Sequence, residues 1–406
     1  MVVGSFAGAM SLGFGLEIGD SMLFARPDNR NDVMCAGSHG GRVNMARALE
    51  IRPRGALFSD GLDAADVAVA TVEAMRARIG DPASTWADGV TSAAARAMLA
   101  HKDACAQKGG VTMPKAAVEG VKLHYDEAGK GTPLVFVHEF AGDAQSWRLQ
   151  TAFFARRYRT LAFNARGYPP SDVPEDPDAY SQQQAADDIK GLLDALGIAR
   201  AHVCGLSMGG LATLHFGLCY PDRAISLVVA GAGYGSDDPE GNRKDVEQVA
   251  RRFETEGMEK TGEFYAHGPS RVQLLEKDPV GWQEFHDRLC AGSAKGHALT
   301  MRGVQMRRPT IYSLEERLTK LEVPTLIVTG DEDEPCLEPA LFMKRKIPMA
   351  ALVVLPKSGH AVNLEEPEAF NRAVLDFLTT VDGGRWTRRR ADSLSKSGIL
   401  PAVASR

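Results

Sequence analysis

The chain has 406 residues, of which 44% are hydrophobic and 24% are charged, and its formal net charge is -5. This length exceeds that of a typical single domain, so we expect two domains, with enough apolar residues for a large core. A charge so close to balance does not favour a nucleic-acid surface. The six cysteines lack the paired spacings of a zinc site or a disulfide framework, which predicts no metal and reduced thiols in a cytoplasmic protein.

Residues 1–110 are predicted to form a small α/β domain. The first 25 residues are apolar and glycine-rich, but they lack a basic start and are interrupted by Glu17 and Asp20. We therefore expect neither a signal peptide nor a membrane-spanning helix there. Hydrophobic periodicity predicts strands at 33–36 and 55–59 and helices at 42–50, 64–79 and 91–99.

A glycine-rich turn at residues 37–41 (Gly-Ser-His-Gly-Gly) precedes the first of these predicted helices. Such a turn can bind phosphate, but this one lacks the lysine of a P-loop and the glycine spacing of a dinucleotide site. A histidine in a turn is more often structural than catalytic, so His39 is given no role. Together with the run Arg-Ile-Gly-Asp at 78–81, the turn resembles small bacterial proteins with no assigned chemistry. Residues 111–117 are predicted to be the linker to the second domain.

A glycine-flanked serine lies between a short apolar run at 203–204 and a predicted buried helix at 211–220. The flanking glycines allow strand and helix to pass closely, and the strained turn between them would hold the hydroxyl of Ser207 out of the backbone. The amide of Met208, at the start of the helix, would point to where an oxyanion forms. The pattern predicts a nucleophilic serine if a base and an acid are also present.

Candidates for both follow two later strands. The β-branched run 324–330 precedes Asp331 and Asp333, and the run 352–355 precedes His360. Active sites gather at the carboxyl ends of parallel strands, so these side chains are expected at the same edge of the sheet as Ser207. The chain order nucleophile, acid, histidine is typical of one hydrolytic fold.

The remaining pattern predicts a mostly parallel, doubly wound sheet interrupted by a helical insertion. An alternating run at 121–125 is typical of an edge strand, and the unbroken apolar run 134–137 is typical of a central parallel strand. The insertion, residues 233–318, is too long for a simple crossover. Further predicted elements are strands at 158–164 and 227–231 and helices at 182–196 and 367–378. The predicted core is therefore 118–232 and 319–380, followed by a basic tail, 381–406, that is expected to be disordered.

Residues from about 117 to 380 resemble an α/β-hydrolase-fold serine hydrolase. The segments that carry the resemblance are 137–142 (Val-His-Glu-Phe-Ala-Gly), 164–172 (Asn-Ala-Arg-Gly-Tyr-Pro-Pro-Ser-Asp), 205–209 (Gly-Leu-Ser-Met-Gly), 330–333 (Gly-Asp-Glu-Asp) and 358–360 (Ser-Gly-His). The resemblance implies that Ser207 is the nucleophile, His360 the base and Asp333 the acid. Asp331 remains the rival acid, but the family places its acid about three residues past the glycine that ends the strand. The helical insertion would be a cap over the active site.

The resemblance also implies an oxyanion hole made by the backbone amides of Met208 and Phe140. The loop before Phe140 usually reads His-Gly in the family, whereas here it reads His-Glu. A carboxylate beside a developing negative charge is unfavourable unless it points away, pairs with a cation or handles protons. Glu139 is therefore either an auxiliary functional residue or a carboxylate that faces the surface or pairs with Arg166.

These residues predict an enzyme that hydrolyses a carboxylic ester or lactone of a small organic molecule, without a cofactor, a nucleic-acid partner or a membrane partner. A serine nucleophile also allows hydrolysis of carbon–carbon bonds, which is the enzymatic alternative. A third possibility is a non-catalytic ligand-binding module of the same fold, because the fold also serves as a receptor.

Overall fold

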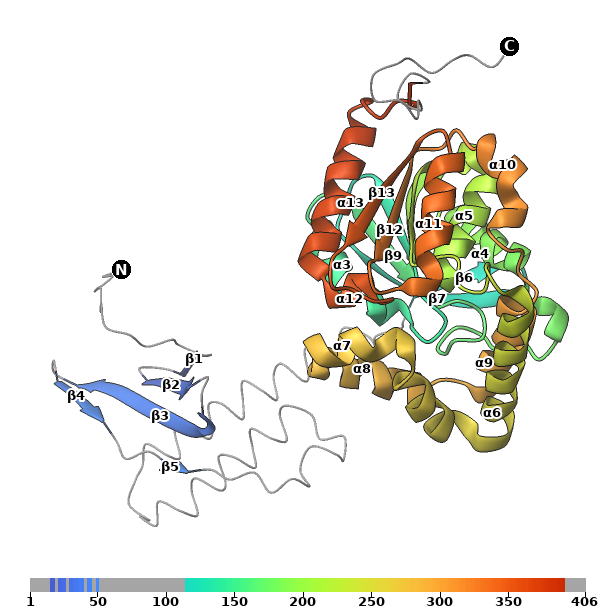
Figure 1. Ribbon diagram of the computed structural model, residues 1–406. Helices are drawn as coiled ribbons and strands as arrows, with labels where there is room; N and C mark the ends of the chain where they lie inside the picture. The colour runs from blue at the N-terminus through green and yellow to red at the C-terminus, as the bar shows by residue number, and fades with distance from the viewer. Residues whose placement is uncertain are drawn as a thin grey trace. The chain divides into compact units, whose positions relative to one another are not determined.

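The computed structural model describes residues 114–390 and, nearer the N-terminus, the backbone of strands between residues 15 and 50. The chain divides into two compact units, Met1–Thr112 and Met113–Arg406, which are described separately (Figure 1).

The first unit contains an antiparallel sheet. Its strands are β1 (Gly15–Ile18), β2 (Ser21–Arg26), β3 (Asn29–His39) and β4 (Arg42–Met45) in that order, with β5 (Leu49–Glu50) paired to β3. The predicted strand 33–36 is confirmed as part of β3, which also runs through half of the predicted glycine turn. The predicted helix 42–50 is wrong, because β4 and β5 both pair with β3. Cross-strand pairing, which no local pattern reveals, decides the structure of so short a segment. The predicted elements 55–59, 64–79 and 91–99 lie outside the described residues.

The second unit is built on an eight-stranded sheet in the order β13-β12-β11-β10-β8-β9-β7-β6. The pairs from β13 to β9 are parallel, and β7 pairs antiparallel with β9 and with β6. This confirms the predicted sheet and its central strands. The strands are β6 (Lys115–Val118), β7 (Val121–Ala128), β8 (Pro133–Val137), β9 (Arg159–Phe163), β10 (Ala201–Leu206), β11 (Ala224–Ala230), β12 (Thr325–Gly330) and β13 (Ala350–Leu355).

The start of the core differs from the prediction. β6 occupies residues that were expected to be linker, and it forms the edge of the sheet, so β7 is not the edge strand. Ala116 and Val118 are buried while Lys115 and Ala117 are exposed, which is the alternation of a strand with one face on the core. Four residues are too few for this alternation to stand out in the sequence.

Helices cover both faces of the sheet (Figure 1). Alternate residues of each strand enter different cores, so that Val203 packs with helices α4, α5, α10 and α11 while its neighbour Cys204 packs with α3 and α13. The helices are α3 (Arg148–Phe154), α4 (Gln182–Ala195), α5 (Met208–Cys219), α10 (Glu315–Thr319), α11 (Glu334–Lys346), the short α12 (Val362–Glu365) and α13 (Pro367–Asp382).

The predicted helical insertion lies between β11 and β12, as expected. In Figure 1 its helices gather at one end of the sheet. A third apolar cluster joins this cap to the core, and it contains Phe253, Phe285 and Met301 from the cap with Phe140 and Met208 from the core. The cap comprises α6 (Pro239–Ala266), α7 (Val272–Lys277), α8 (Pro279–Cys290), α9 (Ala294–Thr300) and a π-helical turn (Met301–Gln305).

The predicted disorder of the tail is wrong for its first residues. After α13 ends, the ring of Trp386 packs edge-on against Phe377 at 4.7 Å between ring centroids, and its indole N–H donates to the carbonyl oxygen of Met349 at 2.8 Å. This aromatic residue anchors the start of the basic tail, while residues 391–406 lie outside the description. None of the described helices has the length and hydropathy needed to cross a membrane.

Candidate active site

The turn at Ser207 has the geometry expected of a strand-to-helix elbow. β10 ends at Leu206 and α5 begins at Met208. Between them, Ser207 has φ 55° and ψ -113°, a backbone conformation that residues other than glycine rarely adopt. A Cβ atom at Gly205 would overlap the carbonyl group of Gly209, so only glycine fits there. The predicted strained turn is confirmed, and strain of this kind at a non-glycine residue is often associated with function.

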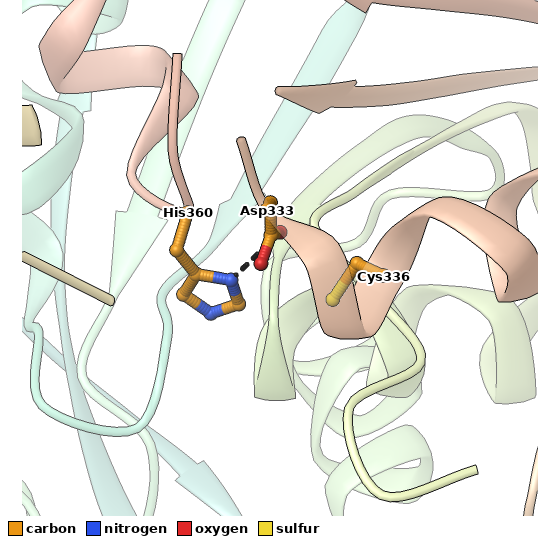
Figure 2. Close-up of side chains that lie close together, drawn as sticks. All are labelled: Asp333, Cys336 and His360. Carbon is orange, nitrogen blue, oxygen red and sulfur yellow. Dashed lines mark hydrogen bonds and ion pairs between the residues drawn. The ribbon is translucent and has the colours of Figure 1, made fainter. Parts of the chain in front are cut away.

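Asp333 and His360 are brought together at the ends of two adjacent strands. Asp333 lies just after β12 and His360 just after β13, and Nδ1 of His360 is 2.9 Å from Oδ2 of Asp333 (Figure 2). Both side chains are buried, at 5% and 8% exposure. An Nδ1–H donated to the carboxylate leaves Nε2 of the imidazole with a lone pair for an incoming proton. Asp331 is exposed and instead accepts a hydrogen bond from the amide of Ser358 at 3.2 Å, so the rival acid does not contact the imidazole.

The carboxyl group of Asp333 is kept ionised by its neighbours. Burial alone would raise its pKa, but the charge and hydrogen bond of His360, a hydrogen bond from Cys336 and the charge of Arg271 together lower it. An ionised carboxylate orients the imidazole and stabilises it when it is protonated.

Cys336 lies beside this pair on α11, and its sulfur, a carboxylate oxygen of Asp333 and a ring nitrogen of His360 lie within 4.8 Å of one another (Figure 2). Burial raises the pKa of the Cys336 thiol well above its ordinary value. The group is therefore a protonated thiol, whose single S–H proton is shared between the Asp333 carboxylate and the carbonyl oxygen of Gly231, 3.4 Å from the sulfur. We therefore assign Cys336 a supporting role as a hydrogen-bonding neighbour of Asp333.

Gly231 connects the serine elbow to the Asp–His pair. The amide of Ser207 donates to the carbonyl oxygen of Ala230 at 2.8 Å. A Cβ atom at the next residue, Gly231, would lie 3.2 Å from Leu206 Cδ1, 3.3 Å from the carbonyl oxygen of His360 and 3.5 Å from Oδ2 of Asp333. All three predicted residues thus border one small region at the carboxyl edge of the sheet. Within residues 114–390, however, Ser207 forms hydrogen bonds only through its backbone, so its contact with the imidazole belongs to the proposal below.

The two predicted oxyanion amides come from neighbouring segments. A Cβ atom at Gly209 would overlap the carbonyl oxygens of Val137 and His138, which puts the loop after β8 directly against the start of α5. In the described part of the chain, neither the Phe140 amide nor the Met208 amide donates to another protein group. Both N–H groups therefore keep their capacity to bind an oxyanion.

Two side chains hold the Phe140 loop. The Tyr168 hydroxyl donates to the carbonyl oxygen of Phe140, and burial raises the pKa of Tyr168, which keeps this donor protonated. Nε2 of His138 accepts from the amide of Ala165 at 3.0 Å, so its Nδ1 carries the proton and donates to the carbonyl oxygen of Glu139 at 2.7 Å. Burial also lowers the pKa of His138 and favours this neutral form.

Glu139 is neither at the surface nor paired with Arg166, so both of these predictions are wrong. Arg166 donates to the two carboxylate oxygens of Asp188 at 2.7 and 2.5 Å. Glu139 is only 1% exposed and faces Arg271 from the cap, whose Nη2 lies 3.8 Å from Oε1. Neither carboxylate oxygen has a hydrogen bond to another described residue. The carboxylate is thus balanced by a cation that the cap supplies.

Sequence reasoning missed two residues of this region, Arg271 and Glu365. Glu365 accepts hydrogen bonds from the amides of Gly359 and Ala361 at 2.5 and 2.9 Å, so it holds the backbone on both sides of His360. The sequence did contain a signal for Glu365, because it is an acidic residue shortly after the histidine and within the first turn of a helix. Arg271 had no such signal, because only the folding of the cap brings it to the core.

A mostly parallel sheet that carries a serine elbow and an Asp–His pair at its strand ends defines a hydrolase class. Residues 134–373 match the alpha/beta hydrolase family, and the chain belongs to that family. This confirms the fold expected from the resemblance.

The match to individual relatives extends over nearly the whole length of each relative. The chain is 28% identical over 283 residues to a 2-hydroxy-6-oxo-6-phenylhexa-2,4-dienoate hydrolase from Burkholderia cepacia, covering 66% of this chain and 95% of that protein. Among solved structures, it is similar to an enol-lactonase from Burkholderia xenovorans LB400 (TM-score 0.59, 27% identity, 66% and 100% coverage). It is also similar to a thermophilic esterase from Thermogutta terrifontis (TM-score 0.60, 27% identity, 66% and 98% coverage).

Proposed function

We propose that the protein is a serine hydrolase that cleaves a carboxylic ester or lactone of a small organic substrate through Ser207, His360 and Asp333. The observation that carries the proposal is the hydrogen bond between Asp333 and His360 at the strand edge where the strained Ser207 turn ends. An imidazole oriented in this way can accept the proton of a serine hydroxyl.

The reaction would proceed through an acyl-enzyme. Nε2 of His360 takes the hydroxyl proton of Ser207 while the serine oxygen attacks the acyl carbonyl of the substrate. The amides of Phe140 and Met208 donate to the resulting oxyanion. The imidazolium then gives its proton to the leaving alcohol oxygen. The same imidazole then deprotonates a water that attacks the acyl-enzyme, and the resulting imidazolium returns the proton to the oxygen of Ser207 as the acid leaves. Each oxyanion donor contributes on the order of 3 kcal/mol to lowering the barrier.

The neighbourhood of the loop after β8 supports this chemistry. Glu139 is matched by the Arg271 guanidinium, so the net charge near the oxyanion amides is balanced rather than negative. The relatives named as an enol-lactonase and an esterase support an ester or lactone substrate. Four unpaired cysteines in the described part of the chain, Cys204, Cys219, Cys290 and Cys336, support a cytoplasmic location.

Carbon–carbon bond hydrolysis is the second candidate, and the relative named as a dienoate hydrolase favours it. A panel of p-nitrophenyl esters of increasing acyl length, simple lactones and vinylogous diketones separates the candidates. We expect turnover of esters or lactones, with Ser207→Ala losing about 10⁴-fold or more in kcat/KM and the control Thr319→Ala, at an exposed hydroxyl on α10, remaining unchanged. Turnover of the diketones alone would select the second candidate. Absence of any turnover would favour a ligand-binding module.

A further inference from the structure

A cavity of about 320 Å³ lies where the cap begins, after β11. Its walls come from the segment that leads into α6, from the first turn of α6 and from the segment after the π-helical turn. Three of its lining residues are arginines, Arg243, Arg307 and Arg308, and none is an aspartate or a glutamate. A cavity with this lining has a positive potential that attracts anions.

Arg308 is held in place in this cavity by hydrogen bonds from its guanidinium group. Its guanidinium is partly buried and donates to the carbonyl oxygen of Tyr234 at 2.6 Å and to the side-chain oxygen of Gln305. Both acceptors are neutral, and burial lowers the pKa of Arg308 to about 10. A desolvated cation is normally paired with a negative charge, because burial of an unpaired charge is unfavourable. Arg308 therefore lines the cavity as a cation without a counter-charge among the described residues.

Three of the acidic residues nearby in the chain are engaged elsewhere, and a fourth, Asp245, lies near enough to the lining residue Tyr234 that burial and this charge together raise the pKa of that tyrosine. The Asp238 carboxylate accepts from the Gly241 amide at 2.9 Å and caps α6, and Asp237 accepts from the hydroxyl of Tyr312. Glu240 pairs with Lys244 at 3.3 Å. Arg243 and Arg307 are exposed and form no ion pair within residues 114–390. The guanidinium groups of Arg243 and Arg307 therefore remain available to a ligand, as do the N–H groups of Arg308 that do not donate to Tyr234 or Gln305.

The cavity follows the candidate active site closely along the chain. The segment that contributes Tyr234 and Ser236 to the cavity begins at Gly231, which borders Asp333 and His360. We propose that this cavity binds the carboxylate or phosphate group of a small anionic ligand, held by the forked N–H groups of Arg307 and Arg308. Guanidinium groups suit both anions because two parallel N–H groups match two oxygens. This proposal concerns binding and stands whether or not Ser207 is a nucleophile.

Isothermal titration calorimetry of the full-length protein tests the proposal, with succinate and inorganic phosphate as separate ligands and sodium chloride at equal ionic strength as the control. We expect saturable binding of at least one of the two anions. Binding of succinate alone would identify organic acids as the ligand class, and binding of both would identify a general oxyanion site. Heat from neither anion beyond that of chloride would overturn the proposal.

Variants locate the binding. Arg308→Met removes the partly buried cation and should weaken binding about 10- to 100-fold. Arg307→Ala changes an exposed side chain, so folding is not at risk, and it should weaken binding about 3- to 10-fold. The matched control is Lys260→Ala, which removes an exposed charge on α6 outside the cavity and should leave binding unchanged. Wild-type affinity in Arg307→Ala, or an equal loss in Lys260→Ala, would overturn the assignment to this cavity.

Discussion

Arg271 of the cap lies 3.8 Å from Glu139 of the core, and both side chains are 1% exposed. Glu139 immediately precedes Phe140, and the charge of Arg271 is one of the influences that lower the pKa of Asp333. The pair therefore links the position of the cap to the electrostatics of the reaction centre.

Removing one member of this pair should cost far more than removing both. Glu139→Met removes the nearest counter-charge of a buried guanidinium and should reduce the free energy of unfolding by about 3 kcal/mol. Arg271→Met should have a similar effect, and the double variant Glu139→Met/Arg271→Met should recover most of the loss because both positions then hold apolar groups. Urea unfolding of the four proteins gives the coupling energy. Additive losses would show that the two charges do not interact.

Glu365 should act on the reaction rate by positioning His360. Glu365→Ala removes the acceptor of the Gly359 and Ala361 amides, and the loosened loop should lower kcat about 10- to 100-fold while KM changes little. Glu365→Gln, which keeps one acceptor oxygen, should recover part of the rate. The matched control is the neighbouring Glu366→Ala, which removes only a pair with Lys277. A change confined to KM would contradict a positioning role.

Tyr168 should support the oxyanion loop. Tyr168→Phe removes the donor to the Phe140 carbonyl oxygen and should lower kcat/KM about 10-fold, because the Phe140 amide is then less well fixed. Tyr220→Phe is the control, since the Tyr220 hydroxyl donates to Asp187 instead. Equal kcat/KM in Tyr168→Phe and the wild type would show that this hydroxyl does not contribute to the reaction.

His297 should make the protein less stable in mild acid. Its ring lies 5.3 Å from that of Phe140, and burial lowers its pKa to about 4, below the ordinary value of 6.5. Between these values the unfolded chain binds a proton that the folded chain does not, so stability is present above 6.5 and is lost as the pH falls toward 4. His297→Phe should make the dependence of the unfolding free energy on pH shallower by about 1.4 kcal/mol per pH unit over this range. Urea unfolding at several pH values measures it, and an unchanged slope would contradict the prediction.

The sequence was most informative where local chemistry determines the structure. The Ser207 elbow was predictable because only glycine fits at Gly205 and Gly209, and the long apolar strands were predictable because they are buried on both faces. By contrast, β4 and β6 are short strands whose structure depends on a neighbouring strand. Trp386, which anchors the start of the tail on α13, is a single residue within a polar context.

The environment of Glu139 could not be predicted for a related reason. The sequence identified it as unusual, because the resembling family has glycine there, but its partner Arg271 comes from the cap insertion. No spacing rule connects a core loop to a residue on the short helical turn that precedes α7. The pairing depends on how the cap packs on the core, which the apolar cluster around Phe140 and Phe285 determines.

The central claim is that Ser207 is a nucleophile activated by His360. Reaction of the full-length protein with a fluorophosphonate, followed by intact-mass and peptide mass spectrometry, tests it directly. The account predicts one covalent adduct on Ser207 in the wild type, and none in Ser207→Ala or His360→Ala. An unmodified Ser207, or equally fast labelling in His360→Ala, would contradict it.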